Sequence, residues 1–193
     1  TYGADTARLF MLSDSPPERD LDWSISGVDG CWKYLKKIWA HIHNYSFDKE
    51  NTKVLIKAND KENNIRREIY LCIKTTTESI DSFRYNSAVA SIRKLSNILL
   101  AYKNNSGEEI KEQIILEGWK SFIIMMSPIT PHIAAELWKV IDDSSMLLDQ
   151  KWPSINKNLL NEKKLIIAVQ INGKLKNTIE IEKKDASDKA LHL

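Results

Sequence analysis

The sequence predicts a mainly α protein, in which an antiparallel helical bundle is followed by a short C-terminal β-hairpin. Three observations predict this fold class. Apolar residues recur at spacings of three and four over most of residues 26–141, as in amphipathic helices. Turn-forming residues and prolines separate these stretches. Near the C-terminus, two β-prone runs flank Asn172-Gly173, the dipeptide best suited to a type I′ turn.

The first helix of the bundle is predicted over residues 26–45. Ser24 or Ser26 is available as its N-cap. Its apolar side chains fall on one side and are expected to face the core. They are Trp32, Leu35, Ile38, Trp39 and Ile42.

A polar stretch at residues 46–59 predicts a loop, and the next helix is expected over residues 60–82. The clearest helix follows, because six apolar residues form one stripe at spacings of three and four. They are Tyr85, Ala88, Ile92, Leu95, Leu99 and Tyr102. The turn formers at residues 104–107 predict the end of that helix.

A fourth helix is predicted from Glu108 to the Ser127-Pro128 stop. Thr130 then suits an N-cap and Pro131 the first helical position, so a fifth helix should reach Ile141. These five helices predict an antiparallel bundle. No fixed-period repeat is present, which makes a solenoid the weaker architecture.

After Trp152-Pro153 the composition changes. A short helix is expected within residues 157–162, followed by the β-hairpin over residues 165–182. A lone hairpin is only marginally stable in water. The hairpin is therefore expected either to dock on the bundle or to belong to a larger domain. The start of a further helix near Ala186 favours the second, a small α/β domain that is incomplete in this chain.

Length and composition exclude several classes. A chain of 193 residues buries a core without a disulfide or metal. Cys31 and Cys72 lack a partner at metal-ligand spacing, which predicts free thiols in a reducing compartment and no metal site. No signal-peptide pattern and no apolar run of about 18 residues is present, so we expect a cytoplasmic protein without membrane contact.

The net charge is only +2, but the charges are unevenly distributed. Residues 1–30 contain two Lys or Arg against six Asp or Glu, and residues 31–103 contain fourteen against seven. Attraction to a polyanion follows local charge rather than the total. The distribution therefore predicts that a nucleic-acid-binding face lies in residues 31–103.

The strongest candidates for such contacts are Lys33, Lys36 and Lys37, whose spacing gathers their ammonium groups along one side of a helix. Five further basic residues extend the region. They are Arg66, Arg67, Arg84, Arg93 and Lys94. For both groups, a solvated helix face without a partner remains the alternative interpretation.

No pattern of catalytic residues is present, and we predict no catalytic, metal or cofactor-binding residue in this chain. His41 and His43 are two apart and do not share a helix face, so they are interpreted as structural. His132 is expected to pack or cap rather than react.

Three segments resemble the bacterial leucyl-tRNA synthetases, which are class Ia enzymes. The first is the opening stretch from Thr1 to Ser24, with its Pro16-Pro17 break and Leu21-Asp22-Trp23. The second is Pro128-Ile-Thr-Pro-His-Ile-Ala-Ala-Glu-Leu-Trp138. The third combines Trp152-Pro153 with Val169-Gln-Ile-Asn-Gly-Lys174, and their order and spacing fit the family.

The resemblance implies three parts. Residues 1–25, with a short helix over residues 4–13, would link to the catalytic domain and contact the tRNA stem. Residues 26–153 would form the anticodon-binding-type bundle, and residues 154–193 would begin the C-terminal domain. In this family the basic positions at Lys33 and Lys37 face the inner corner of the tRNA. Arg8 and Arg19 would lie where the stem-contacting region joins the active-site domain.

The resemblance also implies the function. The chain would position tRNA(Leu) for leucylation with ATP and Mg by an upstream catalytic domain of the same polypeptide, and we expect a monomer. The His-x-Gly-His and Lys-Met-Ser-Lys-Ser motifs of the family are not present, so this chain alone is expected to be inactive and to need no cofactor. The alternative from another class is a helical protein-interaction module that does not bind RNA.

Overall fold

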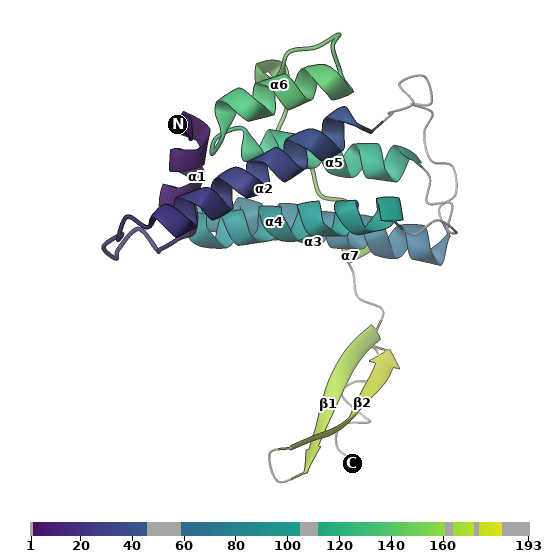
Figure 1. Ribbon diagram of the computed structural model, residues 1–193. Helices are drawn as coiled ribbons and strands as arrows, with labels where there is room; N and C mark the ends of the chain where they lie inside the picture. Colours follow the sequence, from purple (N-terminus) through teal and green to yellow (C-terminus); the bar gives the residue numbers. More distant parts are fainter. Residues whose placement is uncertain (1, 46–58, 105–111, 161–163, 172–173, 183–193) are drawn as a thin grey trace. The chain divides into compact units, whose positions relative to one another are not determined.

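The computed structural model describes residues 2–45, 59–104, 112–160, 164–171 and 174–182. The chain divides into two compact units, Thr1–Ile155 and Asn156–Leu193, and each is described by itself. The first unit is helical (Figure 1). Its helices are α1 (Ala4–Ser13), α2 (Ile25–His43), α3 (Asp60–Asp81), α4 (Tyr85–Asn104), α5 (Glu112–Met126), α6 (Pro131–Ile141) and the short 3-10 helix η1 (Leu147–Asp149).

The predicted helical bundle is therefore confirmed, and the observed bounds lie close to the expected ones. The expected start of the fourth helix at Glu108 and most of the 46–59 loop lie outside the described residues. Within the described part of the chain, no helix is both long enough and apolar enough to cross a lipid bilayer.

Local capping explains where α2 and α3 begin. The Ser24 hydroxyl accepts a hydrogen bond from the Gly27 amide at 3.3 Å, so Ser24 is the N-cap of α2. At α3, the Asn59 side chain accepts from the Glu62 amide at 2.9 Å, and the Glu62 carboxylate accepts from the Asn59 amide at 2.7 Å. This reciprocal capping box satisfies two amides that have no partner within the helix.

The core lies between α3, α4 and α5, which all contact one another, while α2 and α6 pack together on the same bundle. Figure 1 shows α2 lying across α4, with α6 on the other side of α2. The largest fully buried side chains come from the five helices α1 to α5. They include Phe10, Ile38, Ile42, Ile69, Ile73, Ile92, Leu95, Leu99, Ile114, Trp119 and Phe122.

The buried side of α2 differs from the prediction along one edge of its apolar stripe. Val28, Cys31, Leu35, Ile38 and Ile42 are buried, whereas Trp39 keeps 38% of its surface exposed and Trp32 is half-buried. The two tryptophans lie at the edge of the buried stripe rather than at its centre. The expectation that both are anchored in the core was therefore wrong, because large rings are only partly covered at such an edge.

Helix α1 is joined to the corner between α5 and α6 by two side chains. The Arg8 guanidinium donates to the carbonyl oxygens of Ile129 at 2.9 Å and Pro128 at 2.7 Å. The Asp5 carboxylate accepts from the amide of Ile133 at 2.7 Å and contacts Nδ1 of His132 at 2.9 Å. Arg8 thus pairs with carbonyls that follow α5, and Asp5 caps the Ile133 amide in the first turn of α6.

The capping hydrogen bond of α6 comes from a different residue than the sequence predicted. Thr130 occupies the N-cap position and Pro131 the first turn, as predicted, but the Thr130 side chain makes no capping hydrogen bond. Its hydroxyl instead donates to the carbonyl of Met126 at 3.4 Å. The cap is supplied from α1 by Asp5, a contact across 128 residues of sequence that no local pattern indicates.

The second unit contains α7 (Lys157–Leu160), β1 (Lys164–Ile171) and β2 (Lys174–Glu182). The two strands pair antiparallel, with Lys164 opposite Glu182 and Ile171 opposite Lys174. The register shifts after Val169, which leaves Lys176 as an extra residue in β2. The Asn172-Gly173 turn that the sequence predicts lies outside the described residues.

Candidate nucleic-acid interface

The three predicted lysines of α2 lie on the side of the helix that faces away from the core. Lys33, Lys36 and Lys37 are all exposed, while the buried residues of α2 lie on the opposite side. Because positions three and four apart are neighbours on a helix surface, the three side chains form one row. We refer to Lys33, Lys36 and Lys37 as the lysine row.

The members of this row differ in their local partners. The Lys33 ammonium lies 2.7 Å from the Asp29 carboxylate, and this hydrogen bond raises the pKa of Lys33. The Lys36 ammonium lies 4.2 Å from the centroid of the Trp32 ring. No hydrogen-bond or ion-pair partner of Lys37 is found within the described residues. The row therefore presents cations that need little rearrangement to meet a phosphate, because exposed ion pairs such as Lys33–Asp29 are weak.

Arg93 lies next to α2 although it belongs to α4. Its guanidinium lies 4.7 Å from the centroid of the Tyr34 ring, and one nitrogen lies 3.3 Å from Sγ of Cys31. Tyr34 also joins the two helices through a 3.0 Å hydrogen bond with Ser96. Burial raises the pKa of Tyr34 to about 12, which keeps the phenol neutral at ordinary pH. Arg93 is half-buried, and its visible role is to hold α4 against α2.

Arg66 is also engaged in helix packing. Its Nε lies 3.2 Å from the Glu117 carboxylate on α5, and its Nη2 donates to the Tyr70 hydroxyl at 3.0 Å. Tyr70 in turn donates to Glu117 at 2.7 Å. Burial, followed by the Glu117 hydrogen bond, raises the pKa of Tyr70 to about 12. These three side chains form a polar network between α3 and α5.

The other predicted residues are distributed over α3 and α4. Lys94 forms a 2.9 Å ion pair with Glu68, which connects α4 to α3. Arg67 is half-buried on α3, and Arg84 is exposed immediately before α4 begins. The structure thus gathers the lysine row on one side of α2 with Arg93 beside that helix, but it does not gather all eight residues on one helix face.

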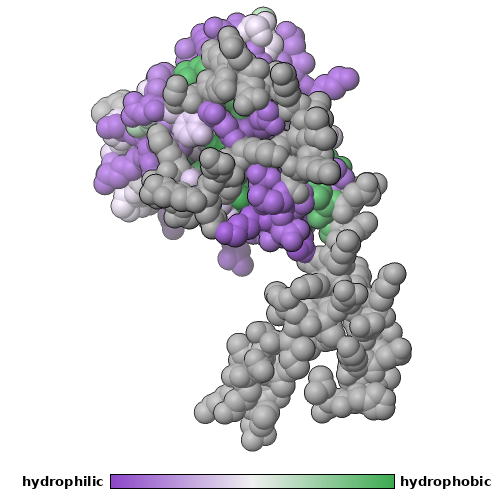
Figure 2. Space-filling view, turned by 90° about the vertical axis from the view of Figure 1, so that its right-hand side faces the viewer, coloured by the Kyte–Doolittle hydropathy of each residue, from purple (hydrophilic) through white to green (hydrophobic). Residues whose placement is uncertain are grey.

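Figure 2 shows one face of the helical unit, on which hydrophilic residues cover most of the coloured surface with small apolar areas between them. Such a surface suits contacts with a solvated partner. Within the described residues, no group of three His, Cys, Asp or Glu side chains is arranged to hold a metal ion.

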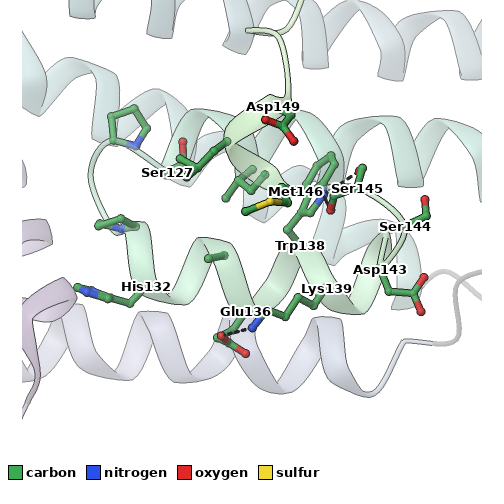
Figure 3. A pocket seen from close by; sticks show the side chains of 15 residues that line it. Ser127, His132, Glu136, Trp138, Lys139, Asp143, Ser144, Ser145, Met146 and Asp149 are labelled. Atoms are coloured by element: carbon green, nitrogen blue, oxygen red, sulfur yellow. Dashed lines mark hydrogen bonds and ion pairs between the residues drawn. The ribbon is translucent and has the colours of Figure 1, made fainter.

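Two concave surfaces adjoin α6. The larger is a groove of about 1130 Å³ between α6 and residues 143–149 (Figure 3). Its lining is mainly apolar and includes the exposed side chains of Met146 and Leu148. The Trp138 indole is fixed there by donating to the carbonyl oxygen of Ser145 at 3.1 Å. His132 lies at one end of the groove, where its Nδ1 contacts the Asp5 carboxylate at 2.9 Å.

The smaller pocket, of about 520 Å³, lies between the start of α1, α2 and α6. It is lined by aromatic and charged side chains, among them Tyr2, Trp32, Lys36, Trp39, His132 and Glu136. Lys36 therefore belongs both to the lysine row and to this pocket. The pocket was not predicted from the sequence, because both tryptophans were expected to lie in the core. Lys36 lies between the two tryptophans in the sequence and on the polar side of the helix. This position could have indicated that the tryptophans lie near the surface.

Comparison with known proteins gives a consistent result. Residues 62–191 match a family described as the anticodon-binding domain of tRNA ligase. The chain is 38% identical over 182 residues to leucine–tRNA ligase of Paramagnetospirillum magneticum, covering 94% of this chain and 21% of the relative. It is 37% identical over 186 residues to leucine–tRNA ligase of Wolbachia pipientis, covering 94% of this chain and 22% of the relative. The chain thus spans about a fifth of the length of these relatives.

A solved structure has the same fold. The match is to a chain in the ternary LeuRS–tRNA–LeuAMS complex of Agrobacterium radiobacter K84, with a TM-score of 0.81 and 24% sequence identity. It covers 100% of this chain and 25% of the other. At this identity the likeness establishes the fold alone.

Proposed function

Because the chain belongs to the anticodon-binding domain family of tRNA ligases, we propose that its helical unit binds tRNA(Leu) and positions it for leucylation. Leucylation itself, with ATP and Mg, is assigned to a catalytic domain of the same polypeptide that lies outside these 193 residues. The leucine–tRNA ligase relatives, which are about five times longer than the matched region, support this division of labour. The protein acts as a cytoplasmic monomer in this proposal.

The observation that carries the proposal is the lysine row on the outer side of α2. Basic side chains on a rigid helix suit the phosphate backbone, and such contacts fix register and orientation rather than read sequence. Holding the tRNA in one orientation lowers the entropic cost of bringing its acceptor end to a distant reaction centre. Lys33 and Lys37 are the first residues assigned to this contact, followed by Lys36.

The remaining basic residues are assigned a secondary role. Arg84 and Lys94 are exposed and are available to the RNA backbone, Lys94 after its Glu68 pair opens. Arg66, Arg67 and Arg93 are half-buried, and Arg66 and Arg93 contribute mainly by holding the helices that carry the exposed residues.

For the domains, we propose that residues 1–25 link the bundle to the catalytic domain, that residues 26–153 form the tRNA-binding bundle, and that residues 154–193 begin the C-terminal domain. In this division the β-hairpin over residues 165–182 is the first part of a small α/β domain. The antiparallel pairing of β1 and β2 and the instability of isolated hairpins support this assignment.

Binding of a tRNA(Leu) transcript over a series of salt concentrations tests the function. The wild-type chain should bind with a log affinity that falls linearly with log salt. Lys33→Ala combined with Lys37→Ala should weaken binding at low salt and reduce the slope by roughly 0.7–0.9 per lost phosphate contact.

The matched control removes the same charge elsewhere. Lys74 is an exposed lysine of α3 that pairs with Glu78, and Lys151 is an exposed lysine that follows η1. The Lys74→Ala, Lys151→Ala double variant should keep the wild-type slope. Equal losses in the two double variants would show that the row has no special role. An absence of tRNA binding by the wild-type chain would refute the function.

The alternative is a helical protein-interaction module. The apolar groove beside α6, with exposed Met146 and Leu148, is the observation that favours it. The same titration separates the two functions, because a module of this kind has no reason to bind tRNA through Lys33 and Lys37.

A further inference from the structure

The pocket between α1, α2 and α6 places aromatic rings next to the ammonium group of Lys36. The proposed contacts with phosphates give these rings no role. Its volume of about 520 Å³ falls within the range of about 300–1,000 Å³ that is typical of small-ligand sites. Two indole rings, of Trp32 and Trp39, and the ammonium group of Lys36 contribute to its lining.

Trp39 is the least covered of these rings. It keeps 38% of its surface exposed, although a tryptophan of an ordinary bundle helix is usually more deeply buried. One side of its indole is stacked against the His43 imidazole, with ring centroids 4.0 Å apart and planes 26° from parallel. This stack fixes the ring and leaves the indole available to the pocket that it lines.

Lys36 lies between the two tryptophans on α2. Trp32 and Trp39 are seven residues apart, about two helical turns, so they lie on the same side of the helix. The Lys36 ammonium lies 4.2 Å from the centroid of the Trp32 ring, which holds the cation at the pocket by cation–π attraction. The pocket thus presents a flat ring for stacking and a cation next to it.

The acidic residues of the lining, Asp5 and Glu136, each have partners other than Lys36. Asp5 contacts the His132 ring at 2.9 Å and accepts from the Ile133 amide. Glu136 forms a 2.6 Å ion pair with Lys139. Within the described residues Lys36 forms no ion pair with a carboxylate, and its ammonium group contacts the Trp32 ring.

We propose that this pocket receives one unpaired nucleotide of the bound tRNA, whose base stacks on the Trp39 indole and whose phosphate contacts Lys36. The inference rests on the proposed function and adds a base-stacking subsite to it. Proteins recognise unpaired RNA bases by stacking them on aromatic side chains next to a basic track. The lysine row is such a track, and it is continuous with the pocket because Lys36 belongs to both.

Substitutions at Trp39 test the stacking. Trp39→Leu keeps an apolar side chain but removes the aromatic face, and it should weaken tRNA(Leu) binding roughly 10-fold. Trp39→Phe keeps an aromatic face and should stay within about 3-fold of wild type, since every aromatic ring offers a stacking surface. The salt slope should remain at its wild-type value in both variants, because no phosphate contact is lost.

Trp152→Leu is the matched control. Trp152 keeps 37% of its surface exposed, nearly the same as Trp39, but it does not line the pocket, and its indole donates to the Thr77 hydroxyl of α3 at 2.9 Å. Its removal should leave tRNA binding unchanged. Helical circular dichroism and thermal melting of each variant confirm that the bundle is folded before affinities are compared.

Chemical probing of unpaired bases gives a second readout that needs no variant. One unpaired base of tRNA(Leu) should become protected by the wild-type chain and should be reactive again with Trp39→Leu. Wild-type affinity for Trp39→Leu, or the absence of any protected base, overturns the stacking subsite while leaving the proposed function intact. Failure of the wild-type chain to bind tRNA overturns the proposed function itself.

Discussion

Single side chains of α1 connect the first helix to the last part of the bundle. Arg8 pairs with the carbonyl oxygens of Pro128 and Ile129, and Asp5 caps the start of α6. Arg8 was expected to lie where the family's stem-contacting region joins the active-site domain. Its hydrogen bonds place the guanidinium at the corner between α5 and α6.

Replacement of Arg8 by alanine should therefore lower stability. Two carbonyl groups lose a charged donor, and we expect a loss of about 1 kcal/mol in the free energy of unfolding, measured by urea denaturation. Arg19→Ala is the control, because Arg19 is exposed and no side-chain contact of it is seen in the described residues. Equal stabilities of the two variants would contradict a structural role for Arg8.

The two tyrosines with raised pKa values predict a dependence of stability on alkaline pH. Burial raises the pKa of Tyr34 and Tyr70 to about 12, from an unfolded value near 10. Since the folded state holds these protons more tightly, their contribution is fully present below pH 10 and is lost as the pH rises towards 12.

A comparison of Tyr34→Phe with the wild-type chain measures this effect. The variant should lose the hydrogen bond to Ser96 at every pH but should show a smaller further loss of stability between pH 9 and pH 11. Urea denaturation at both pH values, combined with the phenolate absorbance near 295 nm, gives the result. The prediction fails if Tyr34 titrates near pH 10 in the folded chain.

Residue-level predictions from the sequence succeeded where local chemistry decides the outcome. Ser24 as the N-cap and Pro131 in the first turn of α6 depend on neighbouring residues only. Trp39 was assigned to the wrong environment, because periodicity does not show how far a neighbouring helix covers the edge of a stripe. Asp5 was missed, since its partners are 127 and 128 residues away.

At the scale of elements, the helices were largely predictable because each carries its own boundary signals. The stripe from Tyr85 to Tyr102 lies within α4, and the Ser127-Pro128 stop comes directly after α5. The packing of these helices was not predictable, since it depends on how closely their backbones approach. Gly118 marks such a close approach, on the side of α5 that meets Leu99 of α4 and Ile69 of α3.

Gly118→Ala sets two effects against each other. Alanine favours an exposed helix over glycine by about 1 kcal/mol. Here, however, a Cβ atom would lie 2.5 Å from Cδ2 of Leu99 and 3.2 Å from Cδ1 of Ile69. Overpacking of a buried site costs about 1–3 kcal/mol, so we expect a net loss of stability in thermal denaturation.

A second substitution checks the cause of that loss. Leu99→Val removes bulk next to the new methyl group, so the double variant should be more stable than the sum of the two single effects predicts. Strict additivity, or a stabilised Gly118→Ala variant, would mean that Leu99 moves aside at little cost.

At the scale of the whole molecule, the division into two compact units implies that the helical unit is stable without the second unit. The helical unit Thr1–Ile155 has its own core, which includes Trp119, Phe122 and Leu99. Large fully buried side chains come from helices of this unit. The core therefore does not depend on β1 and β2 for its interior.

A chain ending at Ile155 should keep the helical circular dichroism and melt within about 3 °C of the complete chain, which corresponds to less than about 1 kcal/mol. It should also bind tRNA(Leu) through Lys33 and Lys37 with the same salt slope. A large drop in melting temperature would show that the second unit contributes to the helical core.

The attachment of α1 to the α5–α6 corner also affects how the protein emerges from the ribosome. Ten residues without a side-chain cap are too short to remain helical alone, so α1 needs its distant partners to become ordered. The backbone groups that pair with Arg8 are synthesised 120 and 121 residues later. At a translation rate of about 5–20 residues per second, the partners of this amphipathic segment are synthesised roughly 6–24 s after the segment itself. During that interval its apolar side chains Leu9 and Phe10 are open to chaperones.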